Sequence, residues 1–423
     1  MIYLQTSSTQ GTQTRPRLWT FIFIRVGMIT AITGVCTQMF MSAFPQYLQQ
    51  RGFTATQMGL VASGYTICAM VMRIFAGNLI DTKGRRVMCL IGLAMFGFPI
   101  FGFYMGPAIA FIVVLRFFQG FGSSLATIAT GTMAPDVLPK ERMAEGIGYY
   151  GLFNSMATAI GPAVGISFLL RGQTDRFFIV GMVLIVAAMG VASTVNYEKK
   201  AKKASADRKP EMGLSPEEEA FERLAEAEAA EDEKKLFIWK FFDRKAIPAA
   251  IISTLITFST TSITNYVSPF GISIGLSAIG SFFTIQACFM VVSRLVSGKL
   301  AAKIGVFKTI VIGLLLDVVA MLLLSTMTNN AMMFAAAAVR GLGGGLYFPL
   351  LNVLAVQKAA KSRRGKATST YYAAYDIGAG IGAPIWGLVA DHLGGYRSVY
   401  FGAGCLYVIS IAAVYILVGR KEK

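Results

Sequence analysis

Twelve segments of about 20 mostly apolar residues run through the chain, and they constrain its fold more than any other feature. An α-helix rises about 1.5 Å per residue, so a segment of this length can cross the hydrocarbon core of a bilayer. We expect spans at 18–48, 56–80, 86–107, 108–133, 142–169, 175–196, 245–273, 277–301, 306–327, 330–357, 365–390 and 397–418.

Composition agrees with a membrane protein, because 55% of the residues are hydrophobic and only 14% are charged. The segments lack the alternation at every second residue that marks the strands of an outer-membrane barrel. Inside lipid the backbone must therefore satisfy its own hydrogen bonds as helices. The sequence predicts an all-α membrane protein with twelve transmembrane helices.

The positive charges fall mainly on one side of this topology. If the odd-numbered spans leave the cytoplasm, most of the 39 Lys and Arg residues lie in cytoplasmic segments. The opposite side holds Arg51, Arg171, Arg176 and Arg397. Such a bias predicts a multi-pass protein of the cell (inner) membrane with both termini in the cytoplasm. It also explains the net charge of +17 without nucleic acid, which we do not expect as a partner.

A polar stretch divides the chain into two halves. We expect a six-helix half at 1–196, a cytoplasmic linker at 197–244 and a second six-helix half at 245–423. Within the linker, Ser215 and Glu218 have the spacing of a capping box and predict one charged helix. The favoured role of the linker is to tether the halves.

The two halves resemble each other in sequence. Arg73 and Arg294 lie 221 positions apart, and Gly77 and Gly298 have the same separation. Further matching positions at offsets of 222 to 224 are the pairs Pro162 and Pro384, Asn154 and Asp376, and Arg116 and Arg340. Repeated halves of equal orientation predict a pseudo-two-fold axis along the membrane normal, with a substrate site near the midplane between them.

A charged, glycine-containing turn follows the second span, and it carries a family resemblance. The chain resembles the major facilitator superfamily over its full length, through the signature residues Gly77, Asp81, Gly84, Arg85 and Arg86. The resemblance implies that the acid of this turn lies at the cytoplasmic end of the span at 365–390 and holds a cytoplasmic gate. A carboxylate is favoured at that positive helix end.

The span at 142–169 carries a second pattern similar to one in exporters of the drug and proton antiporter group. Its members are Gly148, Gly161, Pro162 and Gly165. Glycine and proline allow close helix approach and a kink, so a simple packing seam explains the same residues. Arg116 resembles an arginine that this group links to proton coupling.

Two acids fall well inside spans, where an ionisable residue costs about 2.5 to 3.5 kcal/mol on insertion scales. The resemblance places the span of Asp317 at the periphery, so we expect Asp317 to be a structural partner of a neighbouring donor. Asp376 is the candidate proton-coupling carboxylate, with Arg116 or Arg340 as its cationic neighbour. A permanent ion pair that never titrates is the alternative.

Polar residues on several spans are candidates for the wall of a substrate cavity. They are Gln38, Gln46, Tyr150, Asn154, Asn265 and Tyr372. The five cysteines are scattered inside spans and the chain has one histidine, so we expect no metal site and no cofactor. No phosphate-binding loop is present, which argues against ATP as the energy source and against an enzyme.

Together these features predict a monomeric secondary transporter in the lipid bilayer, with protons and a small molecule as its partners. The favoured function is proton-coupled efflux of small amphipathic molecules or metabolites by alternating access. An importer or facilitator of a polar metabolite is one alternative. A transporter-like receptor that signals through the linker is the other.

Overall fold

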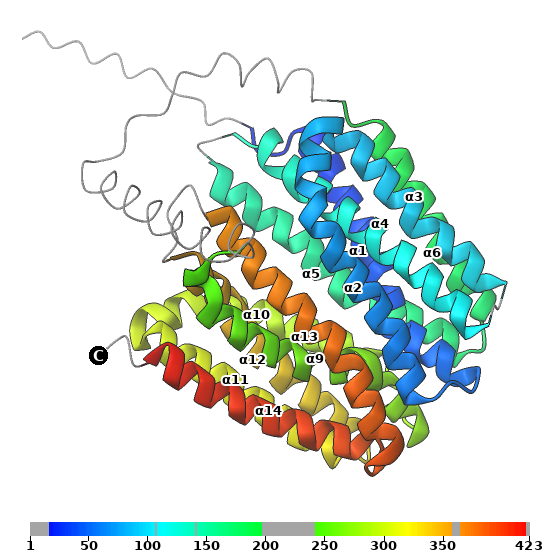
Figure 1. Ribbon diagram of the computed structural model, residues 1–423, viewed down its shortest axis with the longest axis vertical. Helices are drawn as coiled ribbons and strands as arrows, with labels where there is room; N and C mark the ends of the chain where they lie inside the picture. The colour runs from blue at the N-terminus through cyan, green and yellow to red at the C-terminus, as the bar shows by residue number, and fades with distance from the viewer. Residues whose placement is uncertain (1–16, 106–107, 140–141, 197–241, 358–363, 420–423) are drawn as a thin grey trace, which may run out of the picture.

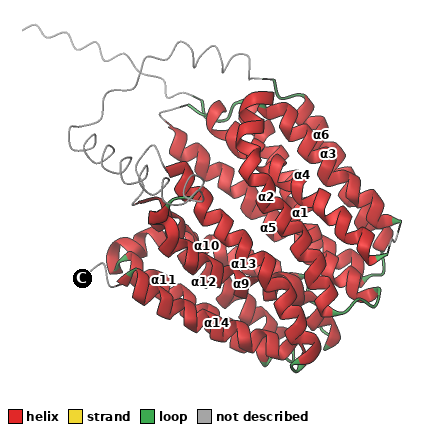
Figure 2. Cartoon of the chain, viewed as in Figure 1, coloured by secondary structure: helices red, strands yellow, loops and turns green. Residues whose placement is uncertain are grey.

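The computed structural model describes residues 17–105, 108–139, 142–196, 242–357 and 364–419. Figures 1 and 2 show the helices gathered into two bundles. The first bundle consists of α1 (Phe21–Gln50), α2 (Ala55–Lys83), α3 (Arg85–Tyr104), α4 (Ile109–Val137), α5 (Met143–Leu170) and α6 (Thr174–Ser193). The second consists of the short 3-10 helix η3 (Arg244–Ala246), α9 (Ile247–Ser273), α10 (Ser281–Ile304), α11 (Val306–Ser325), α12 (Asn330–Gln357), α13 (Arg364–His392) and α14 (Gly395–Leu417).

Twelve helices of the described residues are long and apolar enough to cross a membrane. The predicted all-α, twelve-helix fold is therefore confirmed. The charged helix expected in the linker lies outside the described residues.

Local sequence signals set several helix ends. Thr54 caps α2, since its side-chain oxygen accepts from the Gln57 backbone N–H at 3.3 Å and the Gln57 side chain accepts from the Thr54 N–H at 3.0 Å. At the other end of α2, Gly84 alone separates α2 from α3, with φ of 95°. Gly305 makes the same turn between α10 and α11, with φ of 92°. Both turns need glycine because this backbone conformation is strained for other residues.

Equivalent contacts in the two bundles establish the repeat. The Ser63 hydroxyl donates to the Gly380 carbonyl at 2.5 Å, and the Thr284 hydroxyl donates to the Ala159 carbonyl at 3.0 Å. The two donors lie 221 positions apart in the chain, and so do the two acceptors. Gly120 packs closely on α2, and Gly341 packs closely on α10. The two glycines are 221 positions apart, and so are the residues that they approach.

This constant offset corrects the three sequence pairings made at 222 and 224 positions, and it makes Ala163 rather than Pro162 the counterpart of Pro384. At 221 positions the counterpart of Asp376 is Ser155 rather than Asn154. The counterpart of Arg340 is Gln119, and Arg116 lies about one turn before it on α4. The offsets of 222 and 224 seen in sequence align similar residue types that do not occupy equivalent places.

The bundles meet along α2 with α13, α5 with α10 and α1 with α9. The C-terminal end of α1 and the N-terminal end of α2 lie on one face of the protein, which we call the distal face. It lies opposite the C-terminal end of α6 and the short helix η3, which border the linker. Polar contacts between the bundles gather there. The Tyr266 hydroxyl donates to the Ala55 carbonyl at 3.1 Å, and Ser268 donates to Gln46 at 3.0 Å.

Candidate functional site

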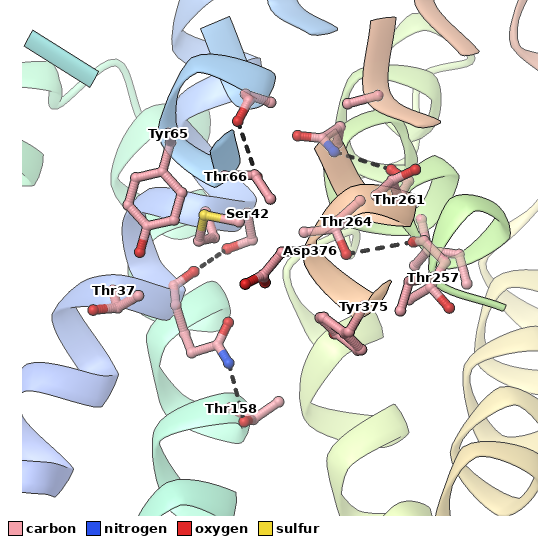
Figure 3. A pocket seen from close by; sticks show the side chains of 18 of the residues that line it. Thr37, Ser42, Tyr65, Thr66, Thr158, Thr257, Thr261, Thr264, Tyr375 and Asp376 are labelled. Atoms are coloured by element: carbon pink, nitrogen blue, oxygen red, sulfur yellow. Dashed lines mark hydrogen bonds between the residues drawn. The ribbon is translucent and has the colours of Figure 1, made fainter. Parts of the chain in front are cut away.

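A cavity of about 340 Å³ lies between the two bundles, and both contribute to its wall. Figure 3 shows Asp376 of α13 between hydroxyl side chains of the first bundle and those of α9. The lining residues with hydroxyl, amide or charged side chains are Thr37, Gln38, Ser42, Tyr65, Thr66, Arg73, Ser123, Ser124, Thr127, Thr158, Thr257, Thr260, Thr261, Thr264, Asn265, Gln286, Arg340, Tyr375 and Asp376. We call this space the central cavity.

Asp376 forms an ion pair across the two bundles. Its Oδ2 lies 3.3 Å from Nε of Arg73 on α2, and the guanidinium of Arg73 lies 5.6 Å from the centre of the Tyr372 ring. Asp376 is 5% exposed, whereas the Arg73 side chain is 36% exposed. The expectation that Arg116 or Arg340 neighbours this acid is therefore wrong, since the partner is Arg73.

Arg340 is bound elsewhere, in a buried network within the second bundle. Its Nη1 donates to Asp317 at 2.8 and 3.0 Å and to the Tyr347 hydroxyl at 2.9 Å, and its Nη2 donates to Thr260 at 3.1 Å. Tyr347 in turn donates to Asp317 at 2.7 Å. The structural role expected of Asp317 is confirmed. Arg340 reaches the cavity wall with its charge already neutralised.

Arg116 is buried in the first bundle and does not line the central cavity. Its Nη1 donates to the Gln119 side-chain oxygen at 2.8 Å, and its guanidinium lies 3.9 Å from the centre of the Phe44 ring. Within the described part of the chain, no carboxylate pairs with it. The guanidinium is held by an amide and aromatic faces rather than by a counter-charge.

The predicted cavity residues lie in four different places. Gln38 and Asn265 line the central cavity, and Asn154 lines a smaller adjoining pocket. Tyr372 contacts Arg73 through its ring. Gln46 and Tyr150 lie off the wall, because Gln46 joins the bundles at the distal face and Tyr150 accepts from the Thr30 hydroxyl at 3.2 Å inside the first bundle.

The charged turn contacts the first bundle where it is described. Arg85 pairs with Asp136 at the end of α4, and Arg86 donates to the Ser193 carbonyl at the end of α6. Gly77 and Asp81 belong to α2, but the side chain of Asp81 lies outside the described part of the structure. The role of Asp81 as a gate stays a prediction.

Two glycines of the pattern on α5 pack closely against α1. A Cβ at Gly161 would come within 2.6 Å of the Val35 carbonyl, and one at Gly165 within 2.7 Å of Met39, so α5 packs tightly on α1. Pro162 lines the central cavity. Gly148 has open space around it and takes no part in this packing.

A contact at the distal face was missed by sequence reasoning. The Asp391 carboxylate, near the end of α13, accepts from the backbone N–H of Ala55 at 3.0 Å and from the backbone N–H and hydroxyl of Thr56 at 2.8 and 2.6 Å. A residue of one bundle thus caps a helix of the other, where free N–H groups favour negative charge. The only sequence signal is an acid near a span end.

Arg73 was noticed in sequence as a repeat position and not as a site residue. The signal that could have found it is a cation inside a span, which in a membrane protein indicates a functional site with a partner. Two polar atoms of the cavity wall also lack hydrogen bonds within the described chain: Ser124 Oγ and Gln286 Oε1. Such buried atoms are available to a bound molecule.

Two bundles of membrane-length helices around a polar cavity are typical of membrane transport proteins. The sequence profile of the Major Facilitator Superfamily matches residues 26–316 and 250–423. The chain belongs to the major facilitator superfamily.

Comparison with known proteins finds relatives of low identity. The chain is 25% identical to an uncharacterised MFS-type transporter of Methanocaldococcus jannaschii, over 86% of this chain and 90% of the relative. It is 22% identical to the staphylopine export protein of Staphylococcus aureus, over 92% and 94% of the two chains. The quinolone resistance protein NorA of Staphylococcus aureus is 24% identical over 34% of each chain.

Among solved structures, a nucleoside transporter, NupG, aligns with a TM-score of 0.75 at 12% identity, over 94% of this chain and 100% of that one. A bacterial homolog of the human lysosomal transporter Spinster, in an inward-facing and occupied conformation, aligns with a TM-score of 0.69 at 12% identity, over 94% and 96%. At these identities the likeness concerns the fold alone.

Proposed function

We propose that the protein is a secondary active transporter that exports small amphipathic molecules or metabolites in exchange for protons. The observation that carries the proposal is Asp376, a carboxylate inside the cavity whose partner, Arg73, belongs to the other bundle. Protonation of Asp376 removes the electrostatic attraction between its carboxylate and the Arg73 guanidinium, one of the contacts that join α2 and α13. A proton can thereby change the free-energy difference between two arrangements of the bundles, as alternating access requires.

The proposal includes an orientation in the cell membrane, with both termini cytoplasmic and the distal face outside. The bias of Lys and Arg toward the linker side supports it. In this orientation the contacts at the distal face close the outer side of the cavity, and we propose that the described arrangement faces the cytoplasm. In the opposite state the distal contacts break, and Asp81 is the candidate that closes the inner side. We propose that one chain carries out this cycle as a monomer.

Efflux is favoured over import by the names of two relatives, the staphylopine export protein and the quinolone resistance protein. The hydroxyl and amide groups of the cavity wall favour the alternative of a polar metabolite as cargo. Transport measurements on liposomes in which the protein has a known orientation decide both the direction of transport and the cargo. Ligand binding without flux would favour the receptor alternative.

Asp376→Asn tests the proposal, because it keeps size and hydrogen bonding while removing the titration. Proteoliposomes with an acidic interior are incubated with a defined mixture of amphipathic metabolites, and uptake is read by mass spectrometry. We expect the wild type to accumulate at least one compound only when the pH gradient is present. Asp376→Asn should exchange that compound across the membrane and lose gradient-driven accumulation.

The matched control is Asp175→Asn, which removes an exposed acid in the first turn of α6, away from the cavity. It should accumulate the compound as the wild type does. Full gradient-driven accumulation by a folded Asp376→Asn protein would contradict the assignment of Asp376 as the coupling site.

A further inference from the structure

A second pocket adjoins the central cavity between α5 and α10. Its volume is about 110 Å³, and Thr158 and Met290 line both spaces, so the two are direct neighbours. Arg294 of α10 lines the pocket together with Asn154 and Ser155 of α5. None of these three residues lines the central cavity itself.

The pocket occupies the place that is equivalent to the Arg73 and Asp376 ion pair. Arg294 lies 221 positions after Arg73, and Ser155 lies 221 positions before Asp376, the offset that the interhelical contacts give. The Ser155 hydroxyl donates to the Gly151 carbonyl at 3.1 Å within its own helix. One interface therefore holds an arginine with a carboxylate, and the other holds an arginine with a serine and an open space.

Among the described residues, the charge of Arg294 has no acidic partner. Arg294 lies near the middle of α10, and no carboxylate of the described chain forms an ion pair with it. A cation at mid-span is costly and indicates a functional site whose partner must be identified. The side-chain amide of Asn154 also makes no hydrogen bond with the described chain, so it can donate to a ligand beside Arg294.

We propose that this pocket binds the carboxylate of the transported molecule. This rests on the proposed function as a transporter and names the chemical class of its cargo, an amphipathic organic carboxylate. The planar guanidinium of Arg294 matches a carboxylate with two parallel hydrogen bonds, and the Asn154 amide supplies a further donor. The cargo's carboxylate takes the place that Asp376 fills in the equivalent interface. Its remaining atoms extend into the central cavity.

Benzoate serves as a probe in a binding experiment that uses no gradient. Purified full-length protein is heated in detergent with increasing benzoate, and the rise of the melting temperature gives the affinity. We expect benzoate to stabilise the wild type and to bind Arg294→Gln at least roughly tenfold more weakly, as the loss of a charge-assisted interaction predicts. Arg294→Lys should retain part of the affinity. Arg171→Gln, at the exposed distal end of α5, is the control and should bind benzoate as the wild type does.

Ser155→Asp provides a second test that keeps Arg294. The new carboxylate should neutralise Arg294 as Asp376 neutralises Arg73, so the protein without ligand should melt at a higher temperature and lose the benzoate response. Ser155→Asn, similar in size and uncharged, should keep that response. This pair remains informative if Arg294→Gln fails to fold.

Three outcomes would overturn the inference. They are equal stabilisation by the neutral analogue benzamide, an unchanged benzoate affinity in folded Arg294→Gln or Ser155→Asp, and equal stabilisation by chloride, which would assign the pocket to an inorganic anion. The transport proposal fails separately. If benzoate binding depends on Arg294 but no compound is accumulated under a pH gradient, the carboxylate site stands and proton-coupled export does not.

Discussion

The two interfaces that join the bundles, α2 with α13 and α10 with α5, occupy equivalent places and are built differently. Along α2 and α13 the backbones touch closely, an ion pair crosses the middle and Asp391 caps α2 at the distal end. Along α10 and α5 the equivalent middle position holds Arg294 beside an open pocket. The difference shows that a repeated fold can place an ion pair in the middle of one interface and an open pocket at the equivalent place of the other.

Two equivalent glycines provide the strongest test of this comparison. A Cβ at Gly59 would lie 2.5 Å from the Ala383 carbonyl and 2.7 Å from the Tyr266 hydroxyl, whereas one at Gly280 would have Ile166 as its nearest neighbour at 3.6 Å. We expect Gly59→Ala to destabilise the closed distal face by about 1–3 kcal/mol through overpacking. Gly280→Ala should change it by less than about 0.5 kcal/mol.

The measurement uses a cysteine at Ser268, a buried distal residue, in a background without native cysteines. A membrane-impermeant maleimide should label this cysteine faster in Gly59→Ala than in Gly280→Ala. Equal labelling of the two variants would show that the close contact along α2 and α13 does not hold the distal face closed.

The second largest effect on the distal face is expected from a change at Asp391. Asp391→Asn removes the negative charge at the N-terminal end of α2 and leaves a weaker acceptor for the N–H groups of Ala55 and Thr56. A charge at a helix end contributes roughly 1 kcal/mol, so the ratio of closed to open distal face should fall about fivefold. The same cysteine probe reports this change. No increase in labelling would mean that the neutral cap holds α2 equally well.

The smallest effect is expected from a hydrogen bond that occurs at the equivalent place in both interfaces. Ser63→Ala and Thr284→Val each remove one hydroxyl that donates to a carbonyl of the facing helix. Each loss should lower the melting temperature by a similar small amount, because one such bond contributes about 0.5–1.5 kcal/mol. A large effect at Ser63 alone would mean that the difference between the interfaces extends to this bond as well.

The helices, their number and their division into two repeated bundles follow from the sequence. Apolar runs of bilayer length and the glycine turns at Gly84 and Gly305 are local signals, and they act through backbone geometry and lipid solvation alone. The prediction that Asp376 is a functional site also comes from the sequence, because an acid inside an apolar span is costly wherever the span packs. The structural role of Asp317 was expected from the family resemblance, which places its span at the periphery.

The tertiary structure decided which residues meet. Arg73, rather than Arg116 or Arg340, faces Asp376 because α2 packs against α13, and Asp391 reaches the N-terminal end of α2 through the same packing. Packing also set the repeat at 221, so that Ser155 stands opposite Arg294. A shift of one residue turns a side chain by about 100° around a helix, so similarity of residue type along the chain could not fix these pairs. The sequence alone determined which charges enter the membrane, and only interhelical packing determined which of them are neutralised.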